Sequence, residues 1–381
     1  MFNGYDFCFI NLINFIMNSV KSLLRPFVSN HLQLNNRFVM APLTRQRANA
    51  DLALTELNAL YYAQRATAGL IVSEASQITP KGQGYPNTPG IYSEKQIEGW
   101  KLVTEAVHQN GGKIFCQLWH VGRHSHPFIQ IDGGLPHAPS AIAEPGLITT
   151  LRGKVETVVP HAMTINEIKT TVEAYAQAAS NAIKAGFDGV EIHAANGYLI
   201  DQFLNDASNT RTDAYGGSID NKIRFAIEVV EAVIQAVGNA KTALRISPSG
   251  TNFGLRNQQP VETFEALVHQ LNAYDLAYVH LIEPDPKSLL NMPQYLLKVT
   301  PHFRPLIQTT LITSAGYDFS GGEEAVESGL ADLVAFGKMF ISNPDFVERY
   351  ATDAPLNAFN MATFYGGGAE GYTDYPFLNQ P

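Results

Sequence analysis

The sequence predicts a (β/α)8 barrel, the TIM-barrel member of the α/β class. From residue 37 onward, short apolar runs alternate about eight times with longer amphipathic segments. The runs are almost continuously apolar, as in parallel strands covered on both faces, whereas half-exposed strands alternate apolar and polar residues. No obvious linker interrupts the alternation, so a closed barrel is favoured over a doubly wound open sheet.

Eight segments are predicted to form the barrel strands. They span residues 37–42, 70–75, 113–120, 189–195, 242–248, 276–283, 310–316 and 331–338. Between them, residues 164–185 place apolar side chains three and four positions apart, which makes one apolar helical face. Thr164 and Glu167 form a capping box at the start of this helix, and Gly186 suits the left-handed residue that ends it. A second helix is predicted over 94–110 from the same signals.

Composition restricts the cellular setting and the partners. The 381 residues carry a formal net charge of −9 and include two cysteines. An acidic chain is a poor partner for nucleic acids or anionic membranes, and two cysteines provide neither a disulfide framework nor a Cys-rich metal site. We therefore expect a cytoplasmic protein, monomeric or homodimeric, that acts on a small molecule.

The first 20 residues differ from the rest of the chain. The apolar run over residues 7–17 is interrupted by two asparagines, and it is too short for a membrane span of about 20 apolar residues. It also lacks the positive segment and the cleavage site of a secretory signal. We expect residues 1–20 to be an N-terminal extension, disordered or placed before a true start at Met17, and residues 21–381 to form a single barrel domain.

Long segments follow the predicted strands at the carboxyl face of the barrel, where active sites of this fold lie. Residues 121–160 are rich in Gly, Pro and His and are expected to form a cap over this face, with smaller contributions from 44–54 and 76–92. The polar residues that converge there are Thr44, Gln117, Trp119, His120, His193, Asn196, Tyr198 and Arg245. Each could be structural alone, but a guanidinium inside an apolar strand requires an anionic or carbonyl partner.

The last two strands end in small residues and a cation. Ser314, Ala315 and Gly316 end the seventh strand, and Gly337 and Lys338 end the eighth. Loops at these two positions commonly hold phosphate in this fold, because small residues let backbone N–H groups approach an anion. The sequence therefore favours a phosphorylated ligand over a neutral one, although glycines at these positions also serve turn geometry alone.

A metal site is an alternative that the residues themselves raise. His120, His124 and His126 are close in sequence, and an H-x-H pair can bind zinc. No carboxylate cluster accompanies them, and a barrel hydrolase needs further ligands from several strand ends, for which only His193 and His280 qualify. We expect no metal site.

Six runs of residues occur together in this chain. They are NRFVMAPLTRQRA from Asn36, QLWHVGR from Gln117, HAANGYLIDQFLNDASNTRTDAYGGSIDNKIRF from His193, LRISP from Leu244, FISNPD from Phe340 and TFYGGGAEGYTDYPF from Thr363. With them the chain resembles the Old Yellow Enzyme family of FMN-dependent ene-reductases, in particular its bacterial branch of alkene, N-ethylmaleimide and nitrate-ester reductases. The run from His193 is the most specific of the six.

The resemblance implies a non-covalently bound FMN. The residues implied to hold it are Pro42, Thr44, Ala75, Gln117, Arg245, Ala315, Gly316, Gly337 and Lys338. The Thr44 hydroxyl would bond the ring carbonyl beside the reactive nitrogen, and Ala75 would let the ring pack closely. Gln117 and Arg245 would face the pyrimidine edge, where a cation stabilises the anionic reduced flavin. The last four residues would hold the phosphate.

The resemblance also implies a catalytic set. His193 and Asn196 would hydrogen-bond a substrate carbonyl or nitro oxygen, which activates the conjugated C=C bond for hydride from the flavin. Tyr198 would give the proton to the α-carbon as a general acid. Trp119 and Tyr365 would line the substrate cavity, and NADPH or NADH would be the electron donor.

Two positions depart from the family pattern. Lys338 stands where the family usually has Arg, so a forked phosphate contact becomes a point charge. His124 stands in the cap where an apolar residue is expected. The alternative to an alkene reductase is a reductase of nitrate esters or nitroaromatics on the same scaffold, and a flavin-binding protein without turnover is disfavoured by the intact catalytic set. The physiological substrate and the choice between NADH and NADPH stay open.

Overall fold

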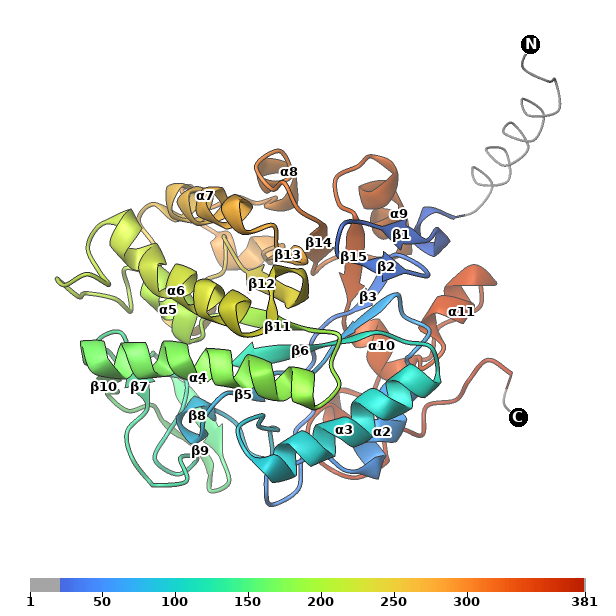
Figure 1. Ribbon diagram of the computed structural model, residues 1–381, viewed down its shortest axis with the longest axis horizontal. Coiled ribbons are helices and arrows are strands. Elements are labelled where there is room, and N and C mark those ends of the chain that lie inside the picture. Colours follow the sequence, from blue (N-terminus) through green and yellow to red (C-terminus); the bar gives the residue numbers. More distant parts are fainter. Residues whose placement is uncertain (1–20, 380–381) are drawn as a thin grey trace, which may run out of the picture.

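The computed structural model describes residues 21–379 and contains the predicted barrel (Figure 1). Eight parallel strands pair in the order β11–β12–β13–β14–β15–β3–β4–β6, and a pairing between β11 and β6 closes the barrel. They are β3 (Phe38–Met40), β4 (Leu70–Val72), β6 (Ile114–Trp119), β11 (Gly189–Ala194), β12 (Thr242–Ile246), β13 (Tyr278–Ile282), β14 (Leu311–Ser314) and β15 (Leu333–Phe336). Each lies within a segment predicted from the sequence, so the fold class is confirmed. The predicted extension over 1–20 lies outside the described residues.

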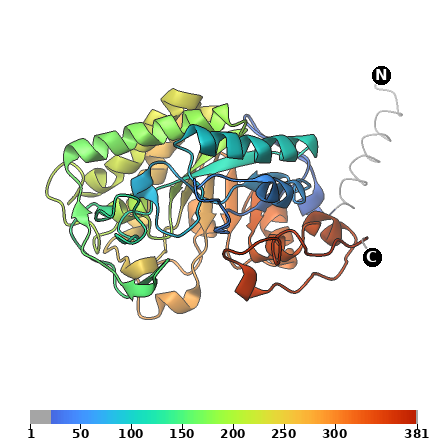
Figure 2. The same cartoon turned by 90° about the horizontal axis from the view of Figure 1, so that it is seen from below.

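Helices follow the strands and cover the outside of the barrel (Figures 1 and 2). They are α2 (Glu56–Ala63), α3 (Glu94–Gln109), α4 (Ile165–Lys184), α5 (Leu199–Leu204), α6 (Ile219–Val237), α7 (Pro260–Leu271), α8 (Thr300–Phe303), α9 (Phe319–Glu327), α10 (Lys338–Ser342) and α11 (Phe346–Ala351). The helix between β13 and β14 has only four residues, because the interval contains Pro293, Pro301 and Pro305, which interrupt helical hydrogen bonding. None of the helices within residues 21–379 is long and apolar enough to cross a membrane.

The predicted helix caps are present. At the start of α4, Glu167 N donates to Thr164 Oγ1 at 3.2 Å and Thr164 N donates to Glu167 Oε2 at 2.7 Å. Gly186 follows the helix with a φ of 91°, the left-handed conformation that glycine adopts without penalty. Ser93 and Gln96 form the same reciprocal box at the start of α3.

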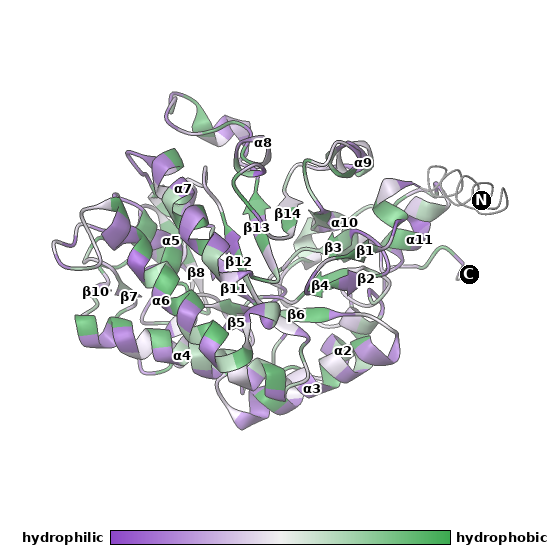
Figure 3. Cartoon of the chain, turned by 45° about the horizontal axis from the view of Figure 1, so that its top comes forward, coloured by the Kyte–Doolittle hydropathy of each residue, from purple (hydrophilic) through white to green (hydrophobic). Residues whose placement is uncertain are grey.

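Apolar side chains fill the barrel from one end. The interior cluster combines strand residues such as Val39, Val72 and Ile312 with Phe27 and Leu34. The last two belong to a small antiparallel hairpin of β1 (Phe27–Val28) and β2 (Gln33–Leu34), just before the first barrel strand. This hairpin fills the amino-terminal end of the barrel, so the polar residues of the barrel lie toward the carboxyl ends of the strands. Figure 3 shows the apolar strands inside the mixed shell of helices.

The predicted cap segment over 121–160 has little regular structure. It contains β7 (His137–Ala138) and a hairpin of β8 (Leu147–Thr150) and β9 (Gly153–Glu156). The pair of residues in β10 (His161–Ala162) runs parallel to β7 and leads into α4. The short β5 (Ser76–Gln77) joins the carboxyl end of β6. These elements lie beside the barrel strands at the end where the polar residues gather.

Candidate active site

The strand register brings the predicted polar residues together. In the parallel ladder, β11 pairs with β6 on one side and β12 on the other, which sets Gln117 beside Glu191 and His193 beside Arg245. The same register sets Arg245 beside His280 of β13. Because side chains at matched positions of parallel strands point to the same side, these groups form a continuous polar layer.

Hydrogen bonds connect this layer. Gln117 Nε2 donates to Glu191 Oε1 at 2.7 Å, and His280 Nδ1 lies 2.8 Å from Glu191 Oε2. Arg245 Nη2 donates to Ser314 Oγ at 3.3 Å. Burial alone would raise the pKa of the Glu191 carboxyl, but His280 and Arg245 outweigh it and hold this pKa below its ordinary value. The layer therefore contains an ionised carboxylate that balances the Arg245 cation.

Four buried nitrogen atoms in or near this layer lack a hydrogen-bond partner among the described residues. They are Arg245 Nε, His193 Nδ1, His280 Nε2 and Trp119 Nε1. Buried polar groups are nearly always paired in folded proteins, so such a cluster at a barrel mouth points to a ligand that completes the pairing. Burial, followed by the charge of Arg245, lowers the pKa of His193 to about 3. His193 is thus a neutral imidazole at physiological pH.

Tyr198 lies next to His193 and Trp119. Its ring is 5.1 Å from the His193 ring and 4.9 Å from the Trp119 ring, centroid to centroid. The Tyr198 hydroxyl is 3.1 Å from the hydroxyl of Tyr85. Burial raises the pKa of the Tyr198 hydroxyl above its ordinary value. Tyr198 is therefore a protonated phenol at neutral pH, as a proton donor has to be.

Asn196 occupies a strained turn between β11 and Tyr198. Its φ is 58°, and Gly197 follows with 86°, so a non-glycine residue adopts a left-handed conformation that normally costs free energy. Asn196 N donates to Ser247 Oγ at 2.9 Å, and Gly197 N donates to Asp201 Oδ2 at 2.8 Å. Ser247 Oγ in turn lies 3.3 Å from Asp201 Oδ2. These hydrogen bonds fix the backbone conformation of the turn, and with it the position from which the Asn196 side chain extends.

The ends of β14 and β15 carry the predicted phosphate loops. Ala315 and Gly316 have φ values of 72° and 80°, and a left-handed alanine is again an uncommon conformation that often marks a functional turn. A Cβ on Gly337 would meet no atom closer than Leu43 Cδ2 at 3.4 Å, so the space beside this backbone is open. Lys338 is exposed, with its Nζ 5.9 Å from the centre of the Phe359 ring.

The remaining predicted residues line the rim. Pro42 and Thr44 are half-buried just after β3, whose end is joined to β15 by Ala41 N donating to Phe336 O. Ala75 packs against Trp119 in a small cluster that Tyr198 also contacts. Tyr365 is 61% exposed. All the predicted site residues therefore lie at strand ends or on the rim of one mouth.

The three clustered histidines have different hydrogen-bond partners. His120 Nδ1 accepts from Gly122 N and His126 Nδ1 accepts from Phe128 N, both at 3.1 Å. His124 Nδ1 instead lies 2.7 Å from Glu144 Oε1, with both side chains buried. Glu144 is distant from His124 in sequence, and folding of the cap brings the two side chains together. The pair lies in the wall of the site, since the His124 ring is 6.0 Å from the Tyr198 ring.

Comparison with known proteins decides the family. The model of the NADH:flavin oxidoreductase / NADH oxidase family matches residues 22–357. The chain belongs to this family. 12-Oxophytodienoate reductase 7 of Oryza sativa subsp. japonica is 43% identical over 376 residues, which cover 94% of this chain and 95% of the relative.

Solved structures of related proteins show which type of enzyme within the family this chain resembles. An old yellow enzyme homologue from Zymomonas mobilis has a TM-score of 0.90 and 42% identity, covering 94% of this chain and 100% of that one. Morphinone reductase has a TM-score of 0.89 and 43% identity, covering 95% and 97%. The chain is thus a flavin oxidoreductase of the Old Yellow Enzyme type, and the resemblance seen in its sequence is confirmed.

The mouth fits the FMN that the family name implies. The unpaired Arg245 Nε and the half-buried Thr44 hydroxyl, which bonds no described residue, offer donors to a polar ring edge. The left-handed Ala315 and Gly316 offer backbone N–H groups to a phosphate, and Lys338 offers a positive charge nearby. Lys338 forms no ion pair with any described carboxylate, so its charge is available to an anion.

Three acidic residues around this flavoprotein site were not predicted from the sequence. Glu191 lies inside a predicted apolar strand, Asp201 behind the Asn196 turn, and Glu144 in the cap. All three are buried. Glu191 could have been found from the sequence, because it is a carboxylate within an apolar strand and a buried charge requires a partner.

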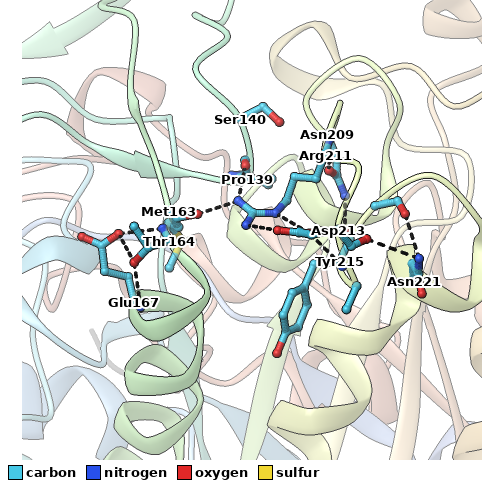
Figure 4. A network of polar contacts seen from close by, with 12 residues as sticks. Pro139, Ser140, Met163, Thr164, Glu167, Asn209, Arg211, Asp213, Tyr215 and Asn221 are labelled. Carbon is cyan, nitrogen blue, oxygen red and sulfur yellow. Dashed lines mark hydrogen bonds and ion pairs between the residues drawn. The ribbon is translucent and has the colours of Figure 1, made fainter.

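The cap is clamped to the barrel by one arginine (Figure 4). Arg211 Nη1 donates to the carbonyl oxygens of Pro139 at 2.8 Å and Met163 at 2.5 Å. Its Nη2 and Nε donate to the carboxylate of Asp213 at 2.6 and 3.0 Å. The clamp thus ties the residues that follow β7 and β10 to the loop that precedes α6.

Proposed function

We propose that this protein reduces activated C=C bonds of enones, maleimides and nitroalkenes with NADPH or NADH, in a single FMN-binding barrel formed by residues 21–381. The observation that carries the proposal is the juxtaposition of an unpaired, neutral His193 with the protonated phenol of Tyr198. When bound, FMN supplies the hydride that adds to the β-carbon of the alkene.

His193 and Asn196 bind and polarise the substrate. A carbonyl or nitro oxygen that accepts hydrogen bonds from both side chains draws electrons out of the conjugated C=C bond. Donors fixed in a dry site stabilise the developing negative charge on that oxygen without having to reorganise. The strained Asn196 turn and its Ser247 and Asp201 bonds keep one donor in place.

Tyr198 delivers the proton. As the β-carbon gains hydride, the α-carbon becomes far more basic than a phenolate, so a phenol with an ordinary pKa of about 10 can protonate it. The Tyr85 hydroxyl at 3.1 Å holds the Tyr198 hydroxyl and bonds the phenolate that forms. Trp119 and Tyr365 complete the cavity, with Trp119 buried and Tyr365 at the rim.

The cofactor contacts follow from the placement of the side chains. Pro42, Thr44 and Ala75 would lie along the flavin, and Gln117 with Arg245 at its pyrimidine edge. Ala315, Gly316, Gly337 and Lys338 would hold the phosphate. The Arg245 cation, balanced by Glu191 from within the barrel, favours an anionic ring at this position.

Relatives support the substrate class and the electron donor. Their names include reductases of 12-oxophytodienoate and of morphinone, both oxo compounds by name. A structure of morphinone reductase contains tetrahydroNAD, which supports a nicotinamide donor here.

Isotope labelling tests the reaction. The purified flavoprotein, cyclohexenone and NADPH or NADH deuterated at the transferred position should give cyclohexanone with deuterium at the β-carbon. The same reaction with unlabelled donor in D2O should place deuterium at the α-carbon. Absence of saturated ketone, together with turnover of nitrate esters or nitroaromatics, would contradict alkene reduction and favour the alternative substrates.

A further inference from the structure

Two histidines meet at the base of the cap, on the paired strands β7 and β10. The parallel pairing of β7 and β10 sets His137 directly opposite His161. Side chains at matched positions of parallel strands point to the same side, and the two imidazole rings are 5.2 Å apart, centroid to centroid. The cap therefore presents a pair of imidazoles from two segments that are distant in sequence.

A carboxylate completes a group of three. Glu167 Oε2 and Oε1 lie 2.9 and 3.1 Å from His161 Nε2. The candidate ligand atoms of His137, His161 and Glu167 all lie within 4.8 Å of one another. The Glu167 carboxylate is fixed in direction, because its Oε2 accepts from Thr164 N at 2.7 Å and Thr164 Oγ1 at 2.9 Å (Figure 4).

We propose that His137, His161 and Glu167 bind a Zn²⁺ ion at the base of the cap. Two imidazole nitrogens and one carboxylate oxygen are ligands that zinc accepts at about 2.0–2.2 Å, with water at a fourth position. Ligand atoms of a tetrahedral zinc lie about 3.4 Å apart, so atoms at the present limit of 4.8 Å have to approach each other by about 1.4 Å. The half-buried His137 ring can turn to do so, since it forms no hydrogen bond with any described residue.

The backbone around this group is already fixed. Pro139 and Met163, whose carbonyl oxygens Arg211 binds, each lie two residues beyond one of the histidines. The arginine thus holds β7 and β10 together before any ion arrives, which reduces the conformational entropy that binding would cost. Zinc at this place would join β7, β10 and the first turn of α4, and so close the base of the cap segment.

Zinc titration of the full-length, FMN-loaded protein tests the site. Competition with a chromophoric zinc chelator should show one equivalent of bound Zn²⁺ per chain, and saturating Zn²⁺ should raise the melting temperature. Co²⁺ in place of Zn²⁺ should give visible absorption bands of a coordinated ion. The His137→Ala variant should bind no equivalent of Zn²⁺, and it should show neither the rise in melting temperature nor the cobalt absorption bands. Its flavin spectrum should be unchanged.

A second histidine provides the matched control. His302 Nε2 lies 2.7 Å from Glu265 Oε1 at the surface, with side-chain exposure of 35% and 33%, but without a third ligand within the part of the chain that the structure describes. His302→Ala should therefore leave the bound equivalent intact. No binding by the unaltered protein, or equal binding by the His137→Ala variant, would overturn the proposal.

Discussion

The barrel mouth and the cap are held in different ways. In the mouth, Gln117, Glu191 and His280 come from strands of the same parallel barrel, so the strand ladder fixes their positions before any side chain makes a bond. The cap has short strands, and Arg211 bonds the backbone carbonyl oxygens of Pro139 and Met163, which follow β7 and β10. Loss of a side chain in the mouth therefore leaves a buried charge unpaired, whereas loss in the cap releases a segment locally.

Glu191→Gln should produce the largest loss of stability. The substitution keeps the shape but removes the carboxylate whose charge acts on the buried Arg245 cation, and leaving a buried charge uncompensated costs about 3–5 kcal/mol. Urea unfolding followed by circular dichroism measures the change in the free energy of unfolding. Glu94→Gln is the control, because the Glu94 side chain is 73% exposed and its ion pair contributes little. Equal midpoints for the two variants would show that Glu191 does not balance Arg245.

Arg211→Met should cost less and act locally. Hydrogen bonds to charged groups are worth about 1.5–3 kcal/mol, and those of Arg211 end on the cap and on Asp213. Hydrogen exchange should therefore quicken at the backbone N–H groups of residues 137–163 and stay slow in the barrel strands. Faster exchange throughout the barrel would contradict the separation between the two regions.

The same difference explains what the sequence could predict. Barrel strands and helix caps depend on local patterns, so all eight strands and the Thr164–Glu167 box were predictable. The partners of buried charges depend on residues far apart in the chain. Gln117 meets Glu191 only through strand pairing, and His124 meets Glu144 only through folding of the cap. The residue types of Gln117 and His124 alone do not indicate which residue each of them contacts.

Asp201 should make stability depend on pH. Burial raises the pKa of this carboxyl to about 7, above an unfolded value of about 3.9. The folded protein therefore retains a proton that the unfolded chain has lost, and the stability from this group falls as pH rises from about 4 through 7. Asp201→Asn carries no charge, so its stability relative to the natural protein should improve by about 2–3 kcal/mol between pH 5 and pH 8.

Melting temperatures of both proteins across this pH range measure the effect. Asp345→Asn is a suitable control, since Asp345 is also buried but is paired with Arg349 at 2.6 Å. That variant should lose stability at every pH tested. A constant difference between Asp201→Asn and the natural protein would mean that Asp201 does not titrate in the folded state.

Lys338 should have the smallest effect. Its exposure lets water screen the charge, so Lys338→Ala should weaken FMN binding by at most about 1 kcal/mol, or roughly fivefold in Kd. Lys338→Arg should tighten binding modestly, because a guanidinium can bond two phosphate oxygens. Titration of the apoprotein with FMN, followed by flavin fluorescence, gives the three constants. Identical constants would show that Lys338 does not contact the phosphate.

Stopped-flow kinetics of Tyr198→Phe test the central claim most directly. The variant keeps the aromatic ring but loses the hydroxyl that would give up the proton, and a positioned acid contributes about 10²–10⁴-fold to such a step. Reduction of the bound flavin by NADPH or NADH should proceed at nearly the natural rate, because it needs no proton from Tyr198. Reoxidation by cyclohexenone should slow by about 10²-fold or more. Reoxidation at the natural rate, with FMN bound normally, would contradict the role of Tyr198 as the proton donor.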